Sequence, residues 1–186
     1  MNVIILGPPG SGKTTQAQLL ATRQGAITVA TGDLLGDAVR NDTDLGRKAK
    51  QFMDSGSMVP DEIILSLVKE QLEAPEAANG VVLDGFPRTV RQARAVTKLL
   101  AAQGRRIKAA LLLDVPEDEI IRRLLARATE QGRDDDAAAI QKRIAAYRAS
   151  NAPLVGNYRE QGVLKFVSGK GTVEEIADEV KRAVGA

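Results

Sequence analysis

The sequence contains no cysteine, no histidine and no tryptophan. Without cysteine, disulfide bonds and thiolate metal sites are excluded, and without histidine neither imidazole ligands nor imidazole acid–base catalysis is available. Chemistry in this chain must therefore depend on lysine, arginine, aspartate, hydroxyl groups, backbone amides and bound ions. We expect no structural zinc, because its usual cysteine and histidine ligands are missing.

Aromatic residues make up only 3% of the chain, although 44% of it is hydrophobic. A core of normal size is therefore expected, built mainly from leucine, valine, isoleucine and alanine. No apolar run reaches the roughly 18 residues of a membrane-spanning helix, and no basic residue precedes the N-terminal run 3–6. These features predict a soluble, cytoplasmic protein with no membrane partner.

Net charge is also nearly absent, since 26 basic residues stand against 24 acidic ones and the formal charge is +2. Because the two kinds of charge are so nearly equal in number, there is no reason to expect nucleic acid as a partner. The 186 residues suit one domain with room for a small inserted subdomain. Information about partners must therefore come from local motifs.

Short apolar runs rich in β-branched residues alternate with segments of helical period. The predicted strands are 3–6, 26–30, 81–84, 109–115 and 163–167. The predicted helical segments are 13–24, 32–72 in several pieces, 89–102, 116–127, 136–160 and 172–184. This alternation predicts an α/β fold with a parallel sheet covered by helices on both faces. Gly46, Gly56 and Pro60 should divide the segment 32–72 into a small helical insertion.

GPPGSGKT at residues 7–14 matches the pattern G-x-x-x-x-G-K-[ST], with a predicted strand before it and a predicted helix after it. The glycines allow backbone N–H groups to turn toward anionic oxygens, and the helix N-terminus adds a partial positive charge. Lys13 is expected to reach the β- and γ-phosphates of a nucleoside triphosphate, and Thr14 to offer its hydroxyl to Mg²⁺. Asp84, at the end of a predicted strand, is expected to hold the same ion through water.

A phosphate-binding loop does not by itself identify a reaction, because GTPases, helicases, ATPases and small-molecule kinases all use one. The guanine-reading pattern N-K-x-D is absent. Phosphoryl transfer requires positive charge around the moving group, and arginine supplies it in a form that never deprotonates. The candidate arginines are Arg88, Arg123, Arg127, Arg133 and Arg143. A solvated basic helix face is the ordinary interpretation of the pair Arg123 and Arg127, and the arginines downstream argue against it.

Several motifs occur in the order found in nucleoside monophosphate kinases, and the sequence most closely resembles the adenylate kinase family. They are GPPGSGKTTQ, ATGDLL, SGSMVPDEI, LDGFPRTVRQ, RRLLAR, GRDDD, KRIAAY and NAPLV. The resemblance covers essentially the whole chain. It implies a five-stranded parallel sheet of the P-loop NTPase type, and transfer of the γ-phosphoryl group from MgATP to AMP by a monomer. It also implies a monophosphate-binding helical insertion at 30–59, a short lid loop at 128–136, and a core of 1–29, 60–127 and 137–186.

The resemblance also assigns roles to individual residues. The catalytic charges are implied to come from Lys13, Arg88, Arg123, Arg127, Arg133 and Arg143. The implied ATP contacts are Gly10, Ser11, Gly12, Lys13, Thr14, Thr15, Arg127 and Gly171. The implied AMP contacts are Thr31, the position of Gly36, Ser57, Met58, Val59, Gly85, Phe86, Pro87, Arg88, Gln92, Arg133 and Arg143.

The choice of nucleobase follows from two of these positions. In the resembling family, a threonine and a glutamine that contact adenine stand where Thr31 and Gln92 stand here. Relatives that use pyrimidine nucleotides differ at both places. AMP is therefore favoured as the acceptor, and a kinase for UMP or CMP is the alternative.

Two features depart from the family pattern. Between Arg127 and Arg133 the chain keeps only a short loop, and the stretch GRDDDAAAIQKR is one residue shorter than the usual spacing, which leaves the register of Asp135 and Arg143 open. The family motif TGD-x-x-Arg, whose arginine binds the AMP phosphate, here ends in Gly36. Either AMP binding is weakened or another cation substitutes, and Arg40 is the nearest candidate by sequence. A nucleotide-binding protein that has lost transfer activity is the alternative that Gly36 supports.

Overall fold

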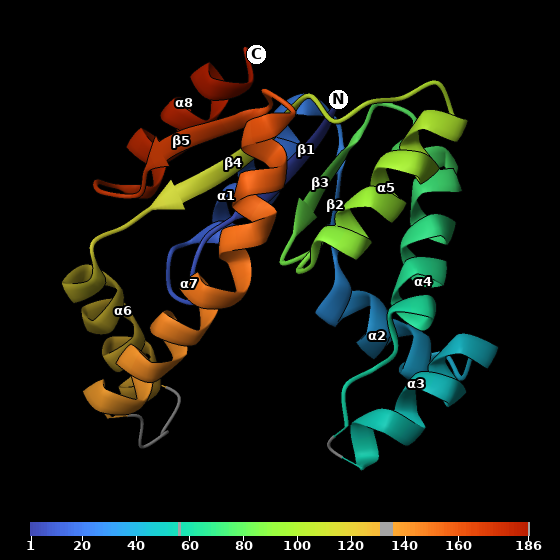
Figure 1. Ribbon diagram of the computed structural model, residues 1–186, viewed down its shortest axis with the longest axis horizontal. Helices are drawn as coiled ribbons and strands as arrows, with labels where there is room; N and C mark the ends of the chain where they lie inside the picture. Colours follow the sequence, from blue (N-terminus) through green and yellow to red (C-terminus); the bar gives the residue numbers. More distant parts are fainter. Residues whose placement is uncertain (56, 131–135, 186) are drawn as a thin grey trace.

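The computed structural model describes residues 1–55, 57–130 and 136–185. Five strands form one sheet in the order β2-β3-β1-β4-β5, and every neighbouring pair is parallel (Figure 1). The strands are β1 (Asn2–Leu6), β2 (Ile27–Ala30), β3 (Val81–Asp84), β4 (Ala109–Asp114) and β5 (Leu164–Ser168). The predicted five-stranded α/β fold is confirmed, and each strand end lies within one residue of its predicted place.

Helices cover both faces of this sheet. One face carries α4 (Asp61–Glu73), α5 (Val90–Ala102) and α7 (Ala137–Glu160), and the other carries α1 (Lys13–Gln24) and α8 (Val173–Val184). All five residues of β1 are buried, and alternate side chains belong to opposite clusters, Ile4 and Leu6 to one and Val3 and Ile5 to the other. Because both faces are covered, the strand is a continuous apolar run rather than an alternating one.

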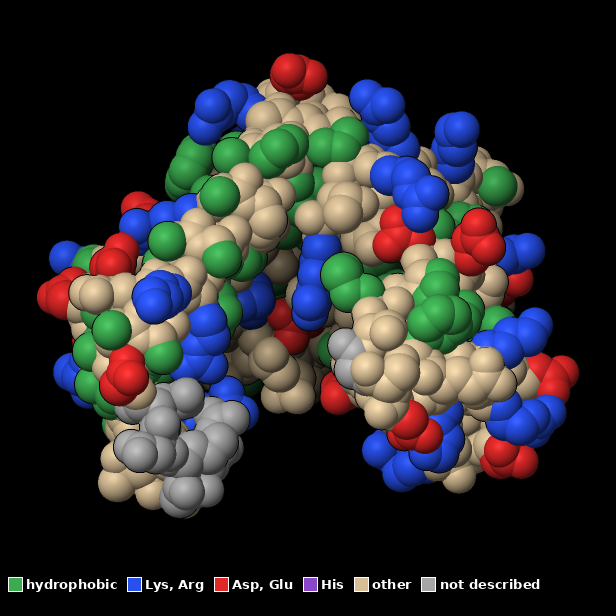
Figure 2. All heavy atoms as spheres, turned by 60° about the horizontal axis from the view of Figure 1, so that its bottom comes forward, with side chains coloured by type: hydrophobic (Ala, Val, Ile, Leu, Met, Phe, Trp, Pro, Cys, Tyr) green, Lys and Arg blue, Asp and Glu red, His purple; other side chains and the backbone are tan. Residues whose placement is uncertain are grey.

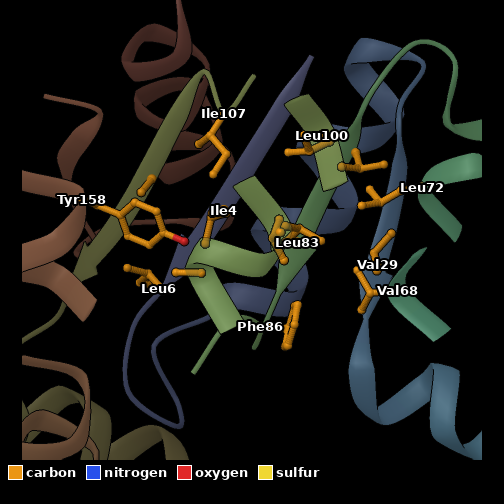
Figure 3. Close-up of a cluster of buried hydrophobic side chains, with 14 of the residues drawn as sticks. Ile4, Leu6, Val29, Val68, Leu72, Leu83, Phe86, Leu100, Ile107 and Tyr158 are labelled. Atoms are coloured by element: carbon orange, nitrogen blue, oxygen red, sulfur yellow. The ribbon is translucent and has the colours of Figure 1, made fainter. Parts of the chain in front are cut away.

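The larger of the two clusters shows how a core low in aromatic residues is filled (Figure 3). Aliphatic side chains from β1, β2 and β3 meet those of α4 and α5, and Phe86 and Tyr158 are the largest fully buried side chains among the described residues. Burial raises the pKa of the Tyr158 hydroxyl well above its usual range. Phe86 follows the carboxyl end of β3, where the loops of interest begin, whereas the Tyr158 carbonyl accepts a hydrogen bond from Val163 just before β5.

Two helical arms extend beyond the carboxyl ends of the strands (Figure 1). The first arm contains α2 (Thr31–Arg40) and α3 (Asp44–Asp54), which pack on α4 through a small cluster of Ala38, Ala49, Ile63 and Leu67. The second arm contains α6 (Glu117–Glu130), packed on the first half of α7 through Ile120, Leu124, Ile140 and Ile144. A short 3-10 helix, η1 (Pro75–Ala77), leads from α4 into β3.

Three expectations about the loops need correction or a limit. Gly46 does not divide the insertion, because it lies inside α3, whereas Pro60 does precede α4 as its N-cap. Residues 128–130, expected in the short lid loop 128–136, belong instead to α6, which continues to Glu130, and Asp136 caps α7 by accepting a hydrogen bond from the N–H of Ala139. Gly56 and residues 131–135 lie outside the described residues. In the described ranges no helix combines the length and the apolar character needed to cross a bilayer.

Gly46 and Gly156 are both helical glycines, but their surroundings predict opposite effects of alanine. A Cβ at Gly46 would lie 2.0 Å from the carbonyl oxygen of Ala38, whereas one at Gly156 would have no atom within 4 Å. We expect Gly46→Ala to lower the free energy of unfolding by about 1–3 kcal/mol, because backbone must move. Gly156→Ala should raise it by about 0.5–1 kcal/mol through helix propensity. Urea denaturation measures both, and equal effects would contradict the packing of α2 on α3.

Candidate active site

The loop between β1 and α1 has the geometry of an anion-binding turn. Gly10 and Gly12 adopt positive φ values of 81° and 90°, which side chains rarely tolerate, and Gly12 is the N-cap of α1. No side chain caps this helix. The first N–H groups of α1 therefore remain available to donate hydrogen bonds to an anion, and the helix dipole adds positive potential at the same place.

The first turn of α1 places Lys13 and Thr14 beside Asp84, the last residue of β3. The Thr14 hydroxyl donates a hydrogen bond of 2.6 Å to Asp84 Oδ2, and Lys13 Nζ donates one of 2.9 Å to the carbonyl of Pro8. Burial lowers the pKa of Lys13, although the nearby Asp84 carboxylate acts in the opposite direction. A lysine held at this point is a fixed positive charge at the edge of the loop.

The same residues suit a magnesium ion. Asp84 is 6% exposed, and its Oδ1 has no hydrogen-bond partner within the described residues. A hydroxyl, a carboxylate and water are ligands that Mg²⁺ prefers, and the ion usually shares them with substrate phosphates. In the part of the chain described, no three aspartates or glutamates cluster as a metal site of their own. Thr14 and Asp84 therefore fit a magnesium ion that arrives with a nucleotide.

A cavity of about 240 Å³ lies between the phosphate loop and the turn after β3. Lys13 and Arg88 both line it, and the carbonyl of Gly85 holds Arg88 by accepting a hydrogen bond of 2.8 Å from its Nε. Figure 2 shows the molecule hollowed between its two arms, with lysine and arginine side chains facing the hollow. One cavity thus offers two cations to anionic groups.

Tyr147 of α7 also lines this cavity, and its role was missed in the sequence, where it appears only as the end of KRIAAY. The Gly7 N–H donates a hydrogen bond of 2.7 Å to the Tyr147 hydroxyl, so α7 is tied directly to the phosphate loop. Burial raises the pKa of this hydroxyl. Tyr147 therefore stays neutral and can act as a donor toward the cavity.

On the other side of the loop, a second cavity of about 360 Å³ brings together segments far apart in the sequence. It is lined by Gly10 to Gly12, by Arg123 of α6, and by Gly171 before α8. Arg123 donates hydrogen bonds of 2.7 Å to Glu119 and 2.9 Å to the carbonyl of Gly169. Hydrogen bonds from Arg122 and Arg123 lower the pKa of Glu119 to about 2, so this carboxylate is ionised and keeps Arg123 in place.

The residues expected on the acceptor side lie along α2, the segment before α4 and the start of α5. Thr31 begins α2 and is buried next to Asp84, because Ala30 pairs with Asp84 in the sheet. Gln92 is also buried, whereas Met58 is 91% exposed. Ser57 and Met58 thus form an open edge of the first arm, whereas Val59 is half-buried and packs against the cluster of Ala38, Ala49, Ile63 and Leu67.

Gly36 lies in α2, and the side chain of Arg40 covers it. A Cβ at Gly36 would be only 3.2 Å from Arg40 Nη1. Arg40 also forms an ion pair with Asp37. The missing side chain at position 36 thus leaves space that the Arg40 guanidinium occupies.

Arg127 and Arg143 line neither of these two cavities. Both are exposed, on α6 and α7 in the second arm. Arg133 lies outside the described residues, as does Asp135. The structure therefore brings Lys13 and Arg88 together at one cavity and Arg123 and Gly171 at the other, and leaves Arg127 and Arg143 on the surface.

These features define a nucleotide-binding protein of the P-loop class. They are a parallel sheet with a phosphate loop at its carboxyl edge, a Thr14–Asp84 pair that suits magnesium, and two cations, Lys13 and Arg88, that line one cavity. The model of the adenylate kinase family matches residues 5–163. The chain is 44% identical over 185 residues to an adenylate kinase of Caulobacter vibrioides, covering 99% of this chain and 97% of the relative. It is 45% identical over 184 residues to that of Thermus thermophilus, covering 98% and 96% respectively. The chain belongs to the adenylate kinase family.

The position of Lys13 generates a test of the site. We expect Lys13→Ala to lower the turnover rate by about 10²–10³-fold, because it removes a preorganised positive charge that stabilises the transition state by about 3–4 kcal/mol. The melting temperature should change little, since only the hydrogen bond to Pro8 is lost. Lys98→Ala, at an exposed position on α5, is the control and should leave turnover unchanged. Normal turnover in the Lys13 variant would contradict this placement of the phosphates.

Proposed function

We propose that this chain catalyses the reversible transfer of the γ-phosphoryl group from MgATP to AMP, giving two molecules of ADP, and so balances adenine nucleotides. The observation that carries the proposal is the cavity between the phosphate loop and the turn after β3, which both Lys13 and Arg88 line. Membership of the adenylate kinase family supports the same reaction. A scaffold without transfer activity would have no need of two cations that face one cavity.

The chemistry requires positioning and charge rather than a covalent intermediate. On the donor side, Lys13, the backbone N–H groups of residues 10–15 and the dipole of α1 hold the triphosphate. A bound Mg²⁺ would neutralise charge on the triphosphate, with Thr14 and Asp84 as its protein ligands. On the acceptor side, Arg88 holds the monophosphate so that its oxygen lies in line with the γ-phosphorus.

The second arm is proposed to complete this site. Arg123 and Gly171 would bind ATP in the cavity beside the loop, and Arg127 would add a further phosphate contact. Arg143 and Arg133 are proposed to contact both phosphate groups. Because Arg127 and Arg143 lie beyond the two cavities, these contacts require the second arm to approach the phosphate loop.

AMP is the proposed acceptor. Thr31 and Gln92 would contact its base, and the other residues proposed for the pocket are Ser57, Met58, Val59, Gly85, Phe86, Pro87 and Arg88. The protein is proposed to act as a cytoplasmic monomer on these small molecules, without nucleic acid or membrane partners. Its nearly balanced charge supports the absence of a nucleic-acid partner.

An assay that follows ADP formation from ATP and a panel of monophosphates tests the reaction directly. We expect AMP to be used at the highest kcat/KM, with UMP and CMP much poorer. Preference for a pyrimidine monophosphate would favour the alternative kinase. Nucleotide binding without ADP formation would show a protein that has lost transfer.

Arg40 is proposed to supply the acceptor-phosphate contact that Gly36 cannot make. A charge-assisted hydrogen bond to phosphate contributes about 1.5–3 kcal/mol, so Arg40→Ala should raise the KM for AMP by about 10–150-fold and leave that for ATP near normal. Gly36→Arg in the same variant should restore the KM. Arg47→Ala is the matched control, since Arg47 is an exposed arginine of the same arm that pairs with Asp42 and Asp44. If Arg40→Ala has no effect and Gly36→Arg alone lowers the KM, the acceptor side is simply weakened.

Metal dependence provides a separate test. Activity should disappear in EDTA and return with Mg²⁺, because the triphosphate is strongly negative and Asp84 adds a further negative charge, which the ion would offset. Phenanthroline should leave the melting temperature unchanged, because the sequence has no cysteine or histidine to hold zinc. Full activity in EDTA, or a chelator-induced fall in melting temperature, would each contradict one half of this expectation.

A further inference from the structure

Asp61 joins the two segments proposed to hold the acceptor nucleotide. It is the first residue of α4, directly after the segment 57–59, and its carboxylate faces the start of α5. Asp61 Oδ1 accepts a hydrogen bond of 2.6 Å from Gln92 Nε2, and Oδ2 accepts hydrogen bonds of 3.0 Å and 2.7 Å from Arg91. Partial burial opposes ionisation, but the hydrogen bonds from Arg91 and Gln92 outweigh it and lower the pKa of Asp61.

The amide of Gln92 is held from both ends in one orientation. Gln92 is only 5% exposed, and its Oε1 accepts a hydrogen bond of 2.7 Å from the backbone N–H of Arg88. A reversed amide would place its NH₂ group against that N–H and its oxygen against the Asp61 carboxylate. Both contacts would set like polar groups against each other and leave them without hydrogen-bond partners.

The fixed amide still has one free N–H and one free lone pair on Oε1. Adenine presents an amino donor beside a ring-nitrogen acceptor, which is the complement of that pair. A purine with a keto oxygen at the same position presents an acceptor instead, and that oxygen would face Oε1. The fixed orientation therefore distinguishes amino-bearing from keto-bearing purines of the same size.

We propose that Asp61 is a specificity-determining positioning residue: it fixes the amide of Gln92 so that the acceptor site takes the monophosphate of an amino-bearing purine and rejects the keto analogue. The inference rests on the proposed function, in which Gln92 contacts the acceptor base. Asp61 itself does not contact the nucleotide. Its effect is transmitted entirely through the side chain it orients.

The test compares AMP with inosine monophosphate, which carries the keto oxygen in place of the amino group. We expect the unmodified protein to prefer AMP by at least about 10²-fold in kcat/KM at saturating MgATP. In Asp61→Asn, the new carbonyl should turn toward Arg91 and the new NH₂ toward Gln92, which favours the reversed amide. The AMP-to-inosine preference should then fall by roughly tenfold or more.

Arg91→Gln is the matched control, because it removes the ion pair and leaves the Asp61 contact to Gln92 intact. It should change the melting temperature as Asp61→Asn does, yet keep the preference for AMP. A structural role alone would lower activity on both substrates together and leave their ratio unchanged, and that result in Asp61→Asn would overturn the inference.

Gln92→Met keeps the inference testable if Asp61→Asn does not fold. With no amide present, this variant should lose at least as much of the preference for AMP over inosine monophosphate as Asp61→Asn does. Retention of that preference would show that Gln92 does not distinguish the two bases. If the unmodified protein forms no ADP from AMP at all, the proposed function fails rather than this inference. If it uses AMP but discriminates equally well without the Asp61 carboxylate, only the inference fails.

Discussion

The register between β1 and β3 is the constraint on which the site depends. Ile5 lies opposite Asp84, so the chain leaves β1 for the phosphate loop at the level where β3 ends in its carboxylate. The loop then returns Thr14 to within 2.6 Å of Asp84 Oδ2. A shift of one residue would turn Asp84 to the opposite face of the sheet and bury it among apolar side chains. The cost of burying that carboxylate without a partner opposes the shift, because the apolar residues of both strands are buried on either face and do not themselves distinguish the two registers.

The remaining parts of the site are arranged around that edge. β2 ends opposite the same Asp84, which brings Thr31 and the first arm to the proposed acceptor side. β4 ends on the other side of β1 and leads into α6, which brings Arg123 to the proposed donor side. The order of the strands therefore places the residues proposed for the two nucleotides on opposite sides of the phosphate loop.

Much of this arrangement could be predicted from the sequence, because the information is local. Apolar runs bounded by glycines located the strands, and the pattern of residues 7–14 located the phosphate loop. Gly46 was misjudged because its role comes from the close approach of Ala38, a contact that sequence alone does not reveal. Tyr147 and Asp61 were missed for the same reason, since their partners lie 140 and 31 residues away along the chain. The roles of the exposed arginines stay predictions, because they depend on bound nucleotides.

The hydrogen bond between Tyr147 and Gly7 has a mechanical consequence. α7 is a single helix of 24 residues whose first half packs in the second arm and whose second half packs on the sheet. Pro153 interrupts its backbone hydrogen bonding between these halves, which makes that turn the most compliant part of the rod. Tyr147 lies on the arm side of this turn. A bend at this turn would move Tyr147 and, through its hydrogen bond, the backbone of Gly7. The conformation of the phosphate loop and the position of the second arm are therefore coupled.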